Sequence, residues 1–277
     1  MRVHEIWTYP VKSMVGGTVE SAELTTLGIK GDRRWATRSV DLGGIRGAKK
    51  IGALMLCSAV ERDGAAHITL PDGSTVTSGD PDADARISAA IGHAVELQEL
   101  PPASDLDHFR RGPSVSNDPL RELRDVFGRE DDEPLPDFGA FPPEVAEFES
   151  PPGTHHDCWP LMVMTTSSMR ALEAALPGSN TDIRRFRPSL VVETEGAGHP
   201  EFGWTGRTAR MGDDGPVIEF LKPCPRCVMT TRAVAGGIPE DRDILRHIVR
   251  DLDQNLGVYA RVITPGAFHT GDKVTFI

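Results

Sequence analysis

Hydrophobic and polar residues alternate in short runs along the first hundred residues of the chain. Residues 3–9 and 19–25 both have the two-residue period of a half-buried β-strand. In the first of these runs, the alternation predicts that Val3, Trp7 and Tyr9 share one face and that Ile6 lies on the other. The chain therefore opens with short strands.

Turn residues separate the next runs of the same kind. Asp63-Gly64 and Asp72-Gly73 are turn pairs typical of β-hairpins. A short helix is expected at residues 82–91, stopped by Gly92, with a strand after it at 94–100. Residues 1–100 therefore predict a small β-barrel or sandwich.

The composition changes between residues 101 and 152. This stretch is rich in proline and acidic residues, and 120–127 is its one short helical pattern. Such a composition favours a long surface connection, partly mobile, between two folded parts.

Strand and helix patterns return in residues 153–277. Apolar runs at 159–164, 190–193 and 217–221 predict strands, and 257–263 and 273–277 predict two more around the turn Pro265-Gly266. Residues 239–254 show the clearest helical period of the chain. The apolar stripe of this helix is Ile244, Leu245, Ile248, Val249 and Leu252. The fold class that these patterns predict is β-rich α+β.

Composition and charge narrow the classes of function. The chain has 277 residues and a net charge of -11, which disfavours general binding to nucleic acid because phosphate neutralisation supplies most of that affinity. No run approaches the roughly 20 apolar residues of a membrane span, and no signal-peptide core opens the chain. Four cysteines do not make a disulfide framework in a chain of this length. We expect a cytoplasmic protein without membrane or nucleic-acid partners.

The strongest candidate for chemistry is the pair in Pro-Cys-Pro-Arg-Cys, at Cys224 and Cys227. Arg226 lies between the two thiols, and nearby cations favour the reactive thiolate. Structural zinc usually needs a second such pair, which the sequence lacks, and a thioredoxin-like pair would follow the first strand of a βαβ unit. A buried pair without function stays open beside a single reactive or metal-ligating thiolate.

Other polar groups are ambiguous when taken singly. Basic residues at Lys12, Arg33 and Arg187 are ordinary surface charges unless the fold brings them together on an anion. His155 and His156 look like metal ligands, but adjacent strand residues point to opposite faces, so we do not expect them to share one ion.

Several motifs in order resemble a known family. Tyr-Pro-Val-Lys-Ser at residues 9–13 and Gly-Asp-Arg-Arg-Trp at 31–35 resemble the MOSC N-terminal β-barrel module. Phe-Arg-Pro at 186–188, the Cys-Pro-Arg-Cys-x-x-Thr-Thr run at 224–231 and the end of the chain are similar to the MOSC domain. The resemblance implies a small β-barrel module at 1–100, a connection at 101–152 and a MOSC β-barrel domain with a few helices at 153–277.

The resemblance also implies a site for the molybdenum cofactor, a molybdopterin. In this family the second cysteine of the motif binds molybdenum, so Cys227 would be both the metal ligand and the catalytic residue, and a soft thiolate suits such a metal. The positions that would bind the cofactor are Lys12, Ser13, Arg33, Arg187 and Arg226, with Thr166 and Ser167 as further polar contacts. Cys224 would be a neighbour of the metal.

Two departures from the family pattern affect the expected reaction. Ser189 stands where the family has asparagine, and residues 232–237 replace a segment that shapes the substrate pocket in related reductases. The chain also lacks the cysteine run of a plant-type ferredoxin domain. Electrons would therefore come from a separate donor protein of ferredoxin, flavin reductase or cytochrome type.

Three functions follow from these residues. The first is an oxidoreductase that reduces small N-hydroxylated substrates by oxygen-atom transfer. The second is a sulfur carrier that holds a persulfide on Cys227 for cofactor sulfuration. The third is a binding module without catalysis, which the two departures suggest.

Overall fold

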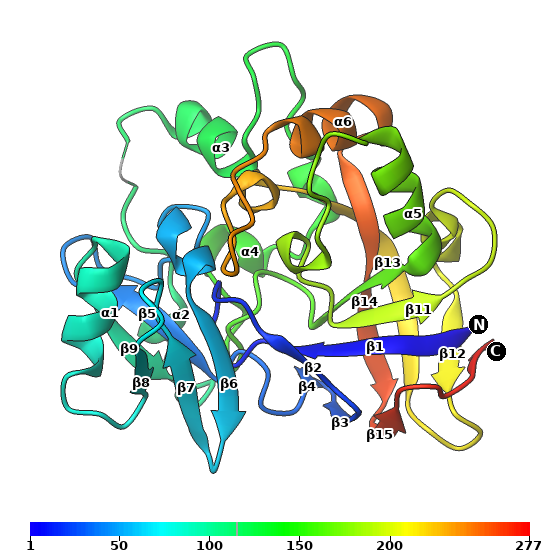
Figure 1. Ribbon diagram of the computed structural model, residues 1–277, viewed down its shortest axis with the longest axis horizontal. Helices are drawn as coiled ribbons and strands as arrows, with labels where there is room; N and C mark the ends of the chain where they lie inside the picture. Colours follow the sequence, from blue (N-terminus) through cyan, green and yellow to red (C-terminus); the bar gives the residue numbers. More distant parts are fainter. Residues whose placement is uncertain (115) are drawn as a thin grey trace.

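The computed structural model describes residues 1–114 and 116–277, which form a β-rich molecule with helices on its outside (Figure 1). This confirms the β-rich α+β class. Four sheets are present, the largest with eight strands in the order β16-β12-β13-β14-β10-β11-β1-β2. The others have the orders β15-β3-β4, β5-β9 and β6-β7-β8. Within the described residues, each sheet has two free ends and none closes into a ring.

The strands are short in the first hundred residues and longer near the end of the chain. Their bounds are β1 Arg2–Thr8, β2 Gly17–Val19, β3 Ser21–Thr25, β4 Gly28–Ile29, β5 Trp35–Ser39, β6 Ser58–Arg62, β7 Ala65–Thr69, β8 Thr75–Thr77, β9 Val95–Glu99, β10 Leu161–Thr165, β11 Leu190–Glu193, β12 Thr208–Met211, β13 Val217–Pro225, β14 Asn255–Thr264, β15 Gly266–His269 and β16 Val274–Phe276. Asp63-Gly64 connects β6 to β7 and Asp72-Gly73 connects β7 to β8, so both form hairpins as the sequence predicts.

The helices of the described residues are short, with at most ten residues each. The α-helices are α1 Ala83–Ile91, α2 Leu106–Phe109, α3 Pro119–Phe127, α4 Glu144–Glu147, α5 Thr166–Ala175 and α6 Asp243–Asp251. The 3-10 helices are η1 Gly52–Leu56, η2 Phe138–Ala140, η3 Ile183–Arg185, η4 Pro200–Trp204 and η5 Val228–Thr231. Gly92 ends α1 in the left-handed conformation, and α6 is shorter than predicted at both ends.

One strand differs from its predicted facing because of a β-bulge. In β1 the register against β11 shifts between Val3 and Glu5, so Val3 turns to the same side as Ile6. Val3 and Ile6 pack in the core of the large sheet, whereas Trp7 and Tyr9 form a separate cluster with Val191. The prediction that Val3 shares a face with Trp7 and Tyr9 is wrong, because simple alternation does not anticipate an extra residue.

Strand pairing crosses between the two ends of the chain. Strand β1 lies between β2 and β11, and β3 pairs with β15, so the first 25 residues join sheets built from residues 161–276. Figure 1 shows β1 running beside β11, with the two chain termini close together. The smaller sheets β5-β9 and β6-β7-β8 lie with α1 on the other side. The N-terminal chain thereby links the two parts that carry the site.

Residues 101–152 are not a simple surface connection. They contain α2, α3, η2 and α4, and they bury Phe109, Arg129, Glu133 and Phe148 against the rest of the molecule. The Glu133 carboxylate forms ion pairs with Arg246 and Arg250. Most of the segment is nevertheless exposed, with Asp107 and Asp131 94% and 91% exposed, so it is a surface connection that is anchored at a few buried positions.

Candidate functional site

The cysteine pair lies where two cores meet. Cys224 is in the last part of β13 and packs with α6 and the outer face of the large sheet. Cys227 begins the short helix η5, and it packs with Met229 against the core of the N-terminal strands. The loop between the two cysteines therefore crosses from one core to the other.

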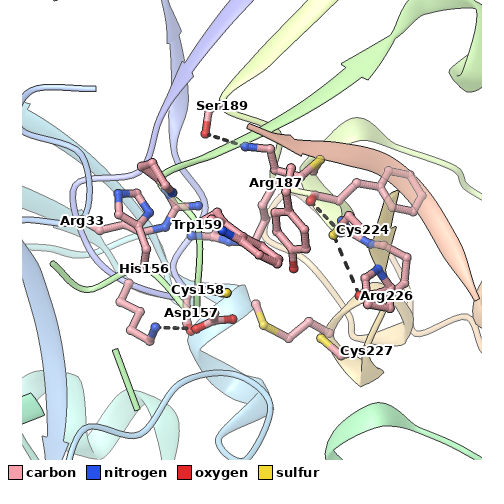
Figure 2. A pocket seen from close by; sticks show the side chains of 18 of the residues that line it. Arg33, His156, Asp157, Cys158, Trp159, Arg187, Ser189, Cys224, Arg226 and Cys227 are labelled. Atoms are coloured by element: carbon pink, nitrogen blue, oxygen red, sulfur yellow. Dashed lines mark hydrogen bonds and ion pairs between the residues drawn. The ribbon is translucent and has the colours of Figure 1, made fainter. Parts of the chain in front are cut away.

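A cavity of about 110 Å³ opens beside this loop and gathers most of the predicted site residues (Figure 2). Residues from six separate stretches of the chain line it. They are Lys12, Ser13, Arg33, His156, Asp157, Cys158, Trp159, Pro160, Met162, Arg185, Phe186, Arg187, Ser189, Cys224, Pro225, Arg226, Cys227, Met229 and Tyr259.

Three of the lining residues have left-handed backbones. The φ angles of Ser13, Arg33 and Arg187 are 71°, 51° and 57°, and only six non-glycine residues of the described chain have positive φ. Such conformations are costly for residues with a Cβ and tend to occur at functional sites. All three residues line the cavity.

Two buried arginines form the cationic side of the cavity. Arg187 donates from Nη1 to the carbonyl of Met14, its guanidinium lies 4.2 Å from the Tyr9 ring centre, and its Nη2 is buried with no partner. Arg226 donates from Nη2 to the Phe186 carbonyl at 2.6 Å and from Nη1 to Cys224 Sγ at 3.3 Å, and its Nε is buried with no partner. Burial and the nearby Arg33 lower the pKa of Arg187 to about 10, which keeps it charged at neutral pH.

Lys12 also lines the cavity and is held by acceptors. Its Nζ donates to the His155 carbonyl at 2.7 Å and to Asp157 at 2.5 Å. Asp157 also pairs with Lys49 at 2.9 Å, so one carboxylate bridges two lysines. Burial would raise the pKa of Asp157, but Lys12 and Lys49 together hold it well below the usual range.

The three thiols around the cavity differ in their surroundings. Burial, reinforced by Asp157, raises the pKa of Cys158 to about 12, so this thiol stays protonated. Cys224 is buried and accepts a hydrogen bond from Arg226. Cys227 is half-buried, and the charges of Lys49, Arg129 and Arg226 all act on its sulfur. Cys227 therefore has the electropositive, partly open surroundings of a reactive or metal-binding cysteine.

Two of the predicted contacts lie elsewhere. Thr166 and Ser167 are in the first turn of α5 and do not line this cavity. Both hydroxyls bond to the Thr194 carbonyl, and Ser167 also reaches the carbonyls of Glu195 and Gly196. In the structure they fasten α5 to the end of β11, outside the cavity that the other predicted residues line.

The site also contains residues that sequence motifs did not indicate. Arg129, from the connecting segment, is buried and donates from Nη2 to the Arg226 carbonyl at 3.0 Å and to Gln254 Oε1 at 3.1 Å. Lys49 and Asp157 complete the charge arrangement around Lys12. The only sequence signal for Arg129 was a basic residue beside an acidic run, which no motif rule distinguishes from a surface charge.

The two adjacent histidines face different surroundings, as expected. His155 Nε2 lies 2.9 Å from His108 Nε2, and its Nδ1 lies 2.9 Å from the Arg33 carbonyl, whereas His156 lines the cavity. Burial, with Arg33 and Lys12 nearby, holds the pKa of His156 well below its usual value, so it is neutral. Within residues 1–114 and 116–277 no cluster of three or more His, Cys, Asp or Glu side chains could hold a metal ion.

No helix of the described residues is long and apolar enough to cross a membrane. In comparisons with known proteins, the chain is 24% identical to mitochondrial amidoxime reducing component 2 of Bos taurus, over 98% of this chain and 82% of the relative. Among solved structures it is similar to the YuaD protein from Bacillus subtilis, with 10% identity, 99% of this chain and 93% of that chain covered, and a TM-score of 0.43. YiiM from Geobacillus stearothermophilus gives 12% identity, coverages of 43% and 54%, and a TM-score of 0.33.

Family models match most of the chain. The model described as the MOSC N-terminal beta barrel domain matches residues 1–98, and the MOSC domain model matches residues 152–275. The residues around the cavity come from both matched parts. The chain belongs to the MOSC family and carries the MOSC N-terminal beta barrel domain ahead of its MOSC domain.

Proposed function

We propose that the chain binds a molybdenum cofactor in the cationic cavity and reduces N-hydroxylated substrates. The observation that carries this proposal is the pair of buried guanidinium N–H groups without partners, Arg187 Nη2 and Arg226 Nε, beside Cys227. Buried polar groups are almost always hydrogen-bonded, so unpaired cationic donors around one cavity favour an anionic ligand there.

The residues present fit such a cofactor. The cofactor's anionic groups would be held by Lys12, Arg33, Arg187 and Arg226, and its metal would be bound by Cys227. Ser13 would line the site in its left-handed backbone conformation. A cavity of about 110 Å³ is smaller than most small-molecule pockets, so it would enclose the part of the cofactor nearest the cysteine. When bound, the group would supply two-electron redox chemistry at a thiolate-ligated metal.

The protein's own residues would prepare the site for that reaction. Reduction of an N–OH group breaks the N–O bond, consumes two electrons and two protons, and releases water. Asp157 and Lys12 form a hydrogen-bonded pair that reaches the cavity, so they are placed to hold or pass a proton. The electrons would come from a separate donor protein, and the amidoxime-reducing name of the bovine relative supports the substrate class.

Metal analysis of cysteine variants tests the proposal. Protein produced in cells that make the cofactor should contain molybdenum and a releasable pterin, and Cys227→Ser should lose the metal with little change in fold. Cys158→Ser is the matched control, because Cys158 lines the same cavity but is a protonated thiol. Wild-type protein without molybdenum or pterin would refute the proposal. If such protein instead gained a persulfide on Cys227 after treatment with a cysteine desulfurase, the sulfur-carrier alternative would take its place.

A further inference from the structure

Two buried histidines that the proposed function does not use are hydrogen-bonded next to residues of the cavity. His155 Nε2 lies 2.9 Å from His108 Nε2, and His155 Nδ1 lies 2.9 Å from the Arg33 carbonyl oxygen. Only 1% of His155 and 8% of His108 is exposed. Neither histidine lines the cavity, whereas Arg33 does. The two rings therefore form a layer behind a residue of the site.

The acceptors decide which nitrogen of each ring carries a hydrogen. A carbonyl oxygen can only accept, so His155 Nδ1 donates to Arg33. Burial, with Lys12 nearby, lowers the pKa of His155 to about 3, so this ring is neutral at neutral pH and its Nε2 carries no hydrogen. His155 Nε2 is then the acceptor, and His108 Nε2 is the donor. The hydrogen bonds run in one direction, from His108 through His155 to Arg33.

His155 contacts two cationic residues of the cavity at once. Its ring holds the peptide that follows Arg33, whose φ angle of 51° is left-handed. Its backbone carbonyl accepts from Lys12 Nζ at 2.7 Å. A left-handed conformation persists in a residue with a Cβ only where the surrounding structure holds it. A displacement of His155 would therefore reach both Arg33 and Lys12.

His108 comes from the connecting segment and is anchored there. It lies in α2 beside Phe109, which is fully buried, and the ring centres of these two residues are 5.0 Å apart. The Phe109 carbonyl accepts from the Glu149 N–H at 2.9 Å. Neither family model matches residues 99–151, whereas the residues that line the cavity all lie in the matched parts. His108 is thus a contribution of the connecting segment to the support of the site.

We propose that His108 is a positioning residue, which acts through His155 on Arg33 and Lys12 and so raises the affinity of the cavity for anions. Without the His108 donor, the buried His155 Nε2 would lose its partner, and a buried acceptor without a partner favours rearrangement of the ring. Groups that are already held in the binding geometry lose less conformational freedom when a ligand arrives. The inference rests on the proposed function, since it names a residue that supports the same site.

Nitrogen NMR of the histidine rings tests the direction of the hydrogen bonds. In wild-type protein labelled with nitrogen-15 in histidine, long-range proton–nitrogen couplings distinguish a ring nitrogen with a hydrogen from one without. We expect the hydrogen on Nδ1 of His155 and on Nε2 of His108 at neutral pH. A His155 ring whose only hydrogen is on Nε2 overturns the inference, because such a ring cannot donate to Arg33. This result does not depend on the folding of any variant.

Phosphate binding tests the effect on the cavity. The full-length chain is produced in cells that cannot make the cofactor, and its affinity for inorganic phosphate is measured by calorimetry. His108→Phe keeps an aromatic ring but removes the donor. We expect it to bind phosphate about fivefold more weakly, which corresponds to about 1 kcal/mol, the net contribution of one hydrogen bond. His108→Gln should bind within about twofold of wild type, because its amide N–H can take the place of the Nε2 donor.

His93→Phe is the matched control. His93 Nε2 lies 2.9 Å from Ser39 Oγ, so this variant loses a similar hydrogen bond outside the cavity, and its phosphate affinity should equal that of wild type. Three results overturn the inference: wild type that does not bind phosphate, an equal loss in His108→Phe and His93→Phe, and unchanged affinity in His108→Phe. A His108→Gln protein as weak as His108→Phe also overturns it, because the ring and not the donor would then be responsible.

The outcome is separable from that of the proposed function. Wild-type protein without molybdenum refutes the reduction, but a phosphate affinity that depends on the His108 donor still supports the inference. Conversely, wild-type protein that contains molybdenum supports the proposed function, and unchanged phosphate affinity in His108→Phe then overturns the inference alone.

Discussion

Arg129 offers the sharpest test of how the connecting segment supports the site. This side chain is buried, and it donates to the carbonyls of Phe127 at 2.6 Å and Arg226 at 3.0 Å and to the Gln254 amide oxygen at 3.1 Å. Gln254 in turn accepts from the Arg226 backbone N–H at 2.8 Å through its own carbonyl. Arg129 therefore fixes the Arg226 carbonyl directly. Through the Gln254 side chain it also supports the residue whose carbonyl accepts from the Arg226 N–H.

The expected loss of stability can be estimated from these bonds. We consider Arg129→Met, which keeps the apolar stem and removes the donors. A hydrogen bond from a charged group contributes about 1.5–3 kcal/mol, so the two long-range bonds to Arg226 and Gln254 together contribute about 3–6 kcal/mol. Burying the charged Arg129 guanidinium also costs free energy, and this burial lowers its pKa to about 10. The uncharged methionine removes that cost. The net destabilisation should be about 3 kcal/mol.

Two measurements check this estimate. In thermal unfolding, about 3 kcal/mol corresponds to a decrease in Tm of about 6–12 °C for a domain of this size. The molybdenum content of the purified variant should also fall, because the Arg226 carbonyl loses its donor next to Cys227.

Arg121→Met is the control, since Arg121 lies on the same segment, its side chain is 61% exposed, and it pairs only with acidic neighbours such as Asp125. Such an exposed pair contributes at most about 0.5 kcal/mol. A loss below about 1 kcal/mol in Arg129→Met, or one equal to that of Arg121→Met, would refute the reasoning.

Two further variants test other parts of the fold. Ser167→Ala should lower stability by about 1 kcal/mol, since the hydroxyl bonds to the Thr194 carbonyl. The molybdenum content should stay unchanged, and a loss of metal would show that Ser167 contacts the cofactor. Burial raises the pKa of Glu201, so its contribution to stability is present below the unfolded-state pKa and is lost as the pH rises through the folded value. Glu201→Gln should therefore be more stable than wild type at neutral pH by about 1 kcal/mol, and its stability should depend less on pH. The reason is that the glutamine amide can accept from Thr165 and donate toward the unpaired His199 Nδ1. Urea unfolding across pH 4–8 measures this, and lower stability of the variant at neutral pH contradicts it.

Local patterns in the sequence predicted most elements correctly. The strand at β11, the hairpins around Gly64 and Gly73, and the helix stop at Gly92 follow from short-range physics, namely the period of buried positions and the φ angles that glycine tolerates. Strand β15 was missed because its four residues follow the Pro265-Gly266 turn and it is defined by pairing with distant β3.

The candidate site also has residues that the sequence predicted and residues that it did not. Ordered motifs singled out Lys12, Arg33, Arg187 and Cys227, and the fold brings these side chains to one cavity. Thr166 lies outside this cavity, and its hydroxyl bonds to the backbone of Thr194 just after the end of β11.

The sequence by itself determined which residue types could carry chemistry and which short segments could form strands and helices. Only the tertiary structure decided that Arg129 and Asp157 belong to the site, and that Cys158 is a protonated thiol while Cys227 lies among cationic side chains. The physical reason is that burial, charge pairing and aromatic contact depend on distances between segments far apart in the chain, which a local pattern does not contain.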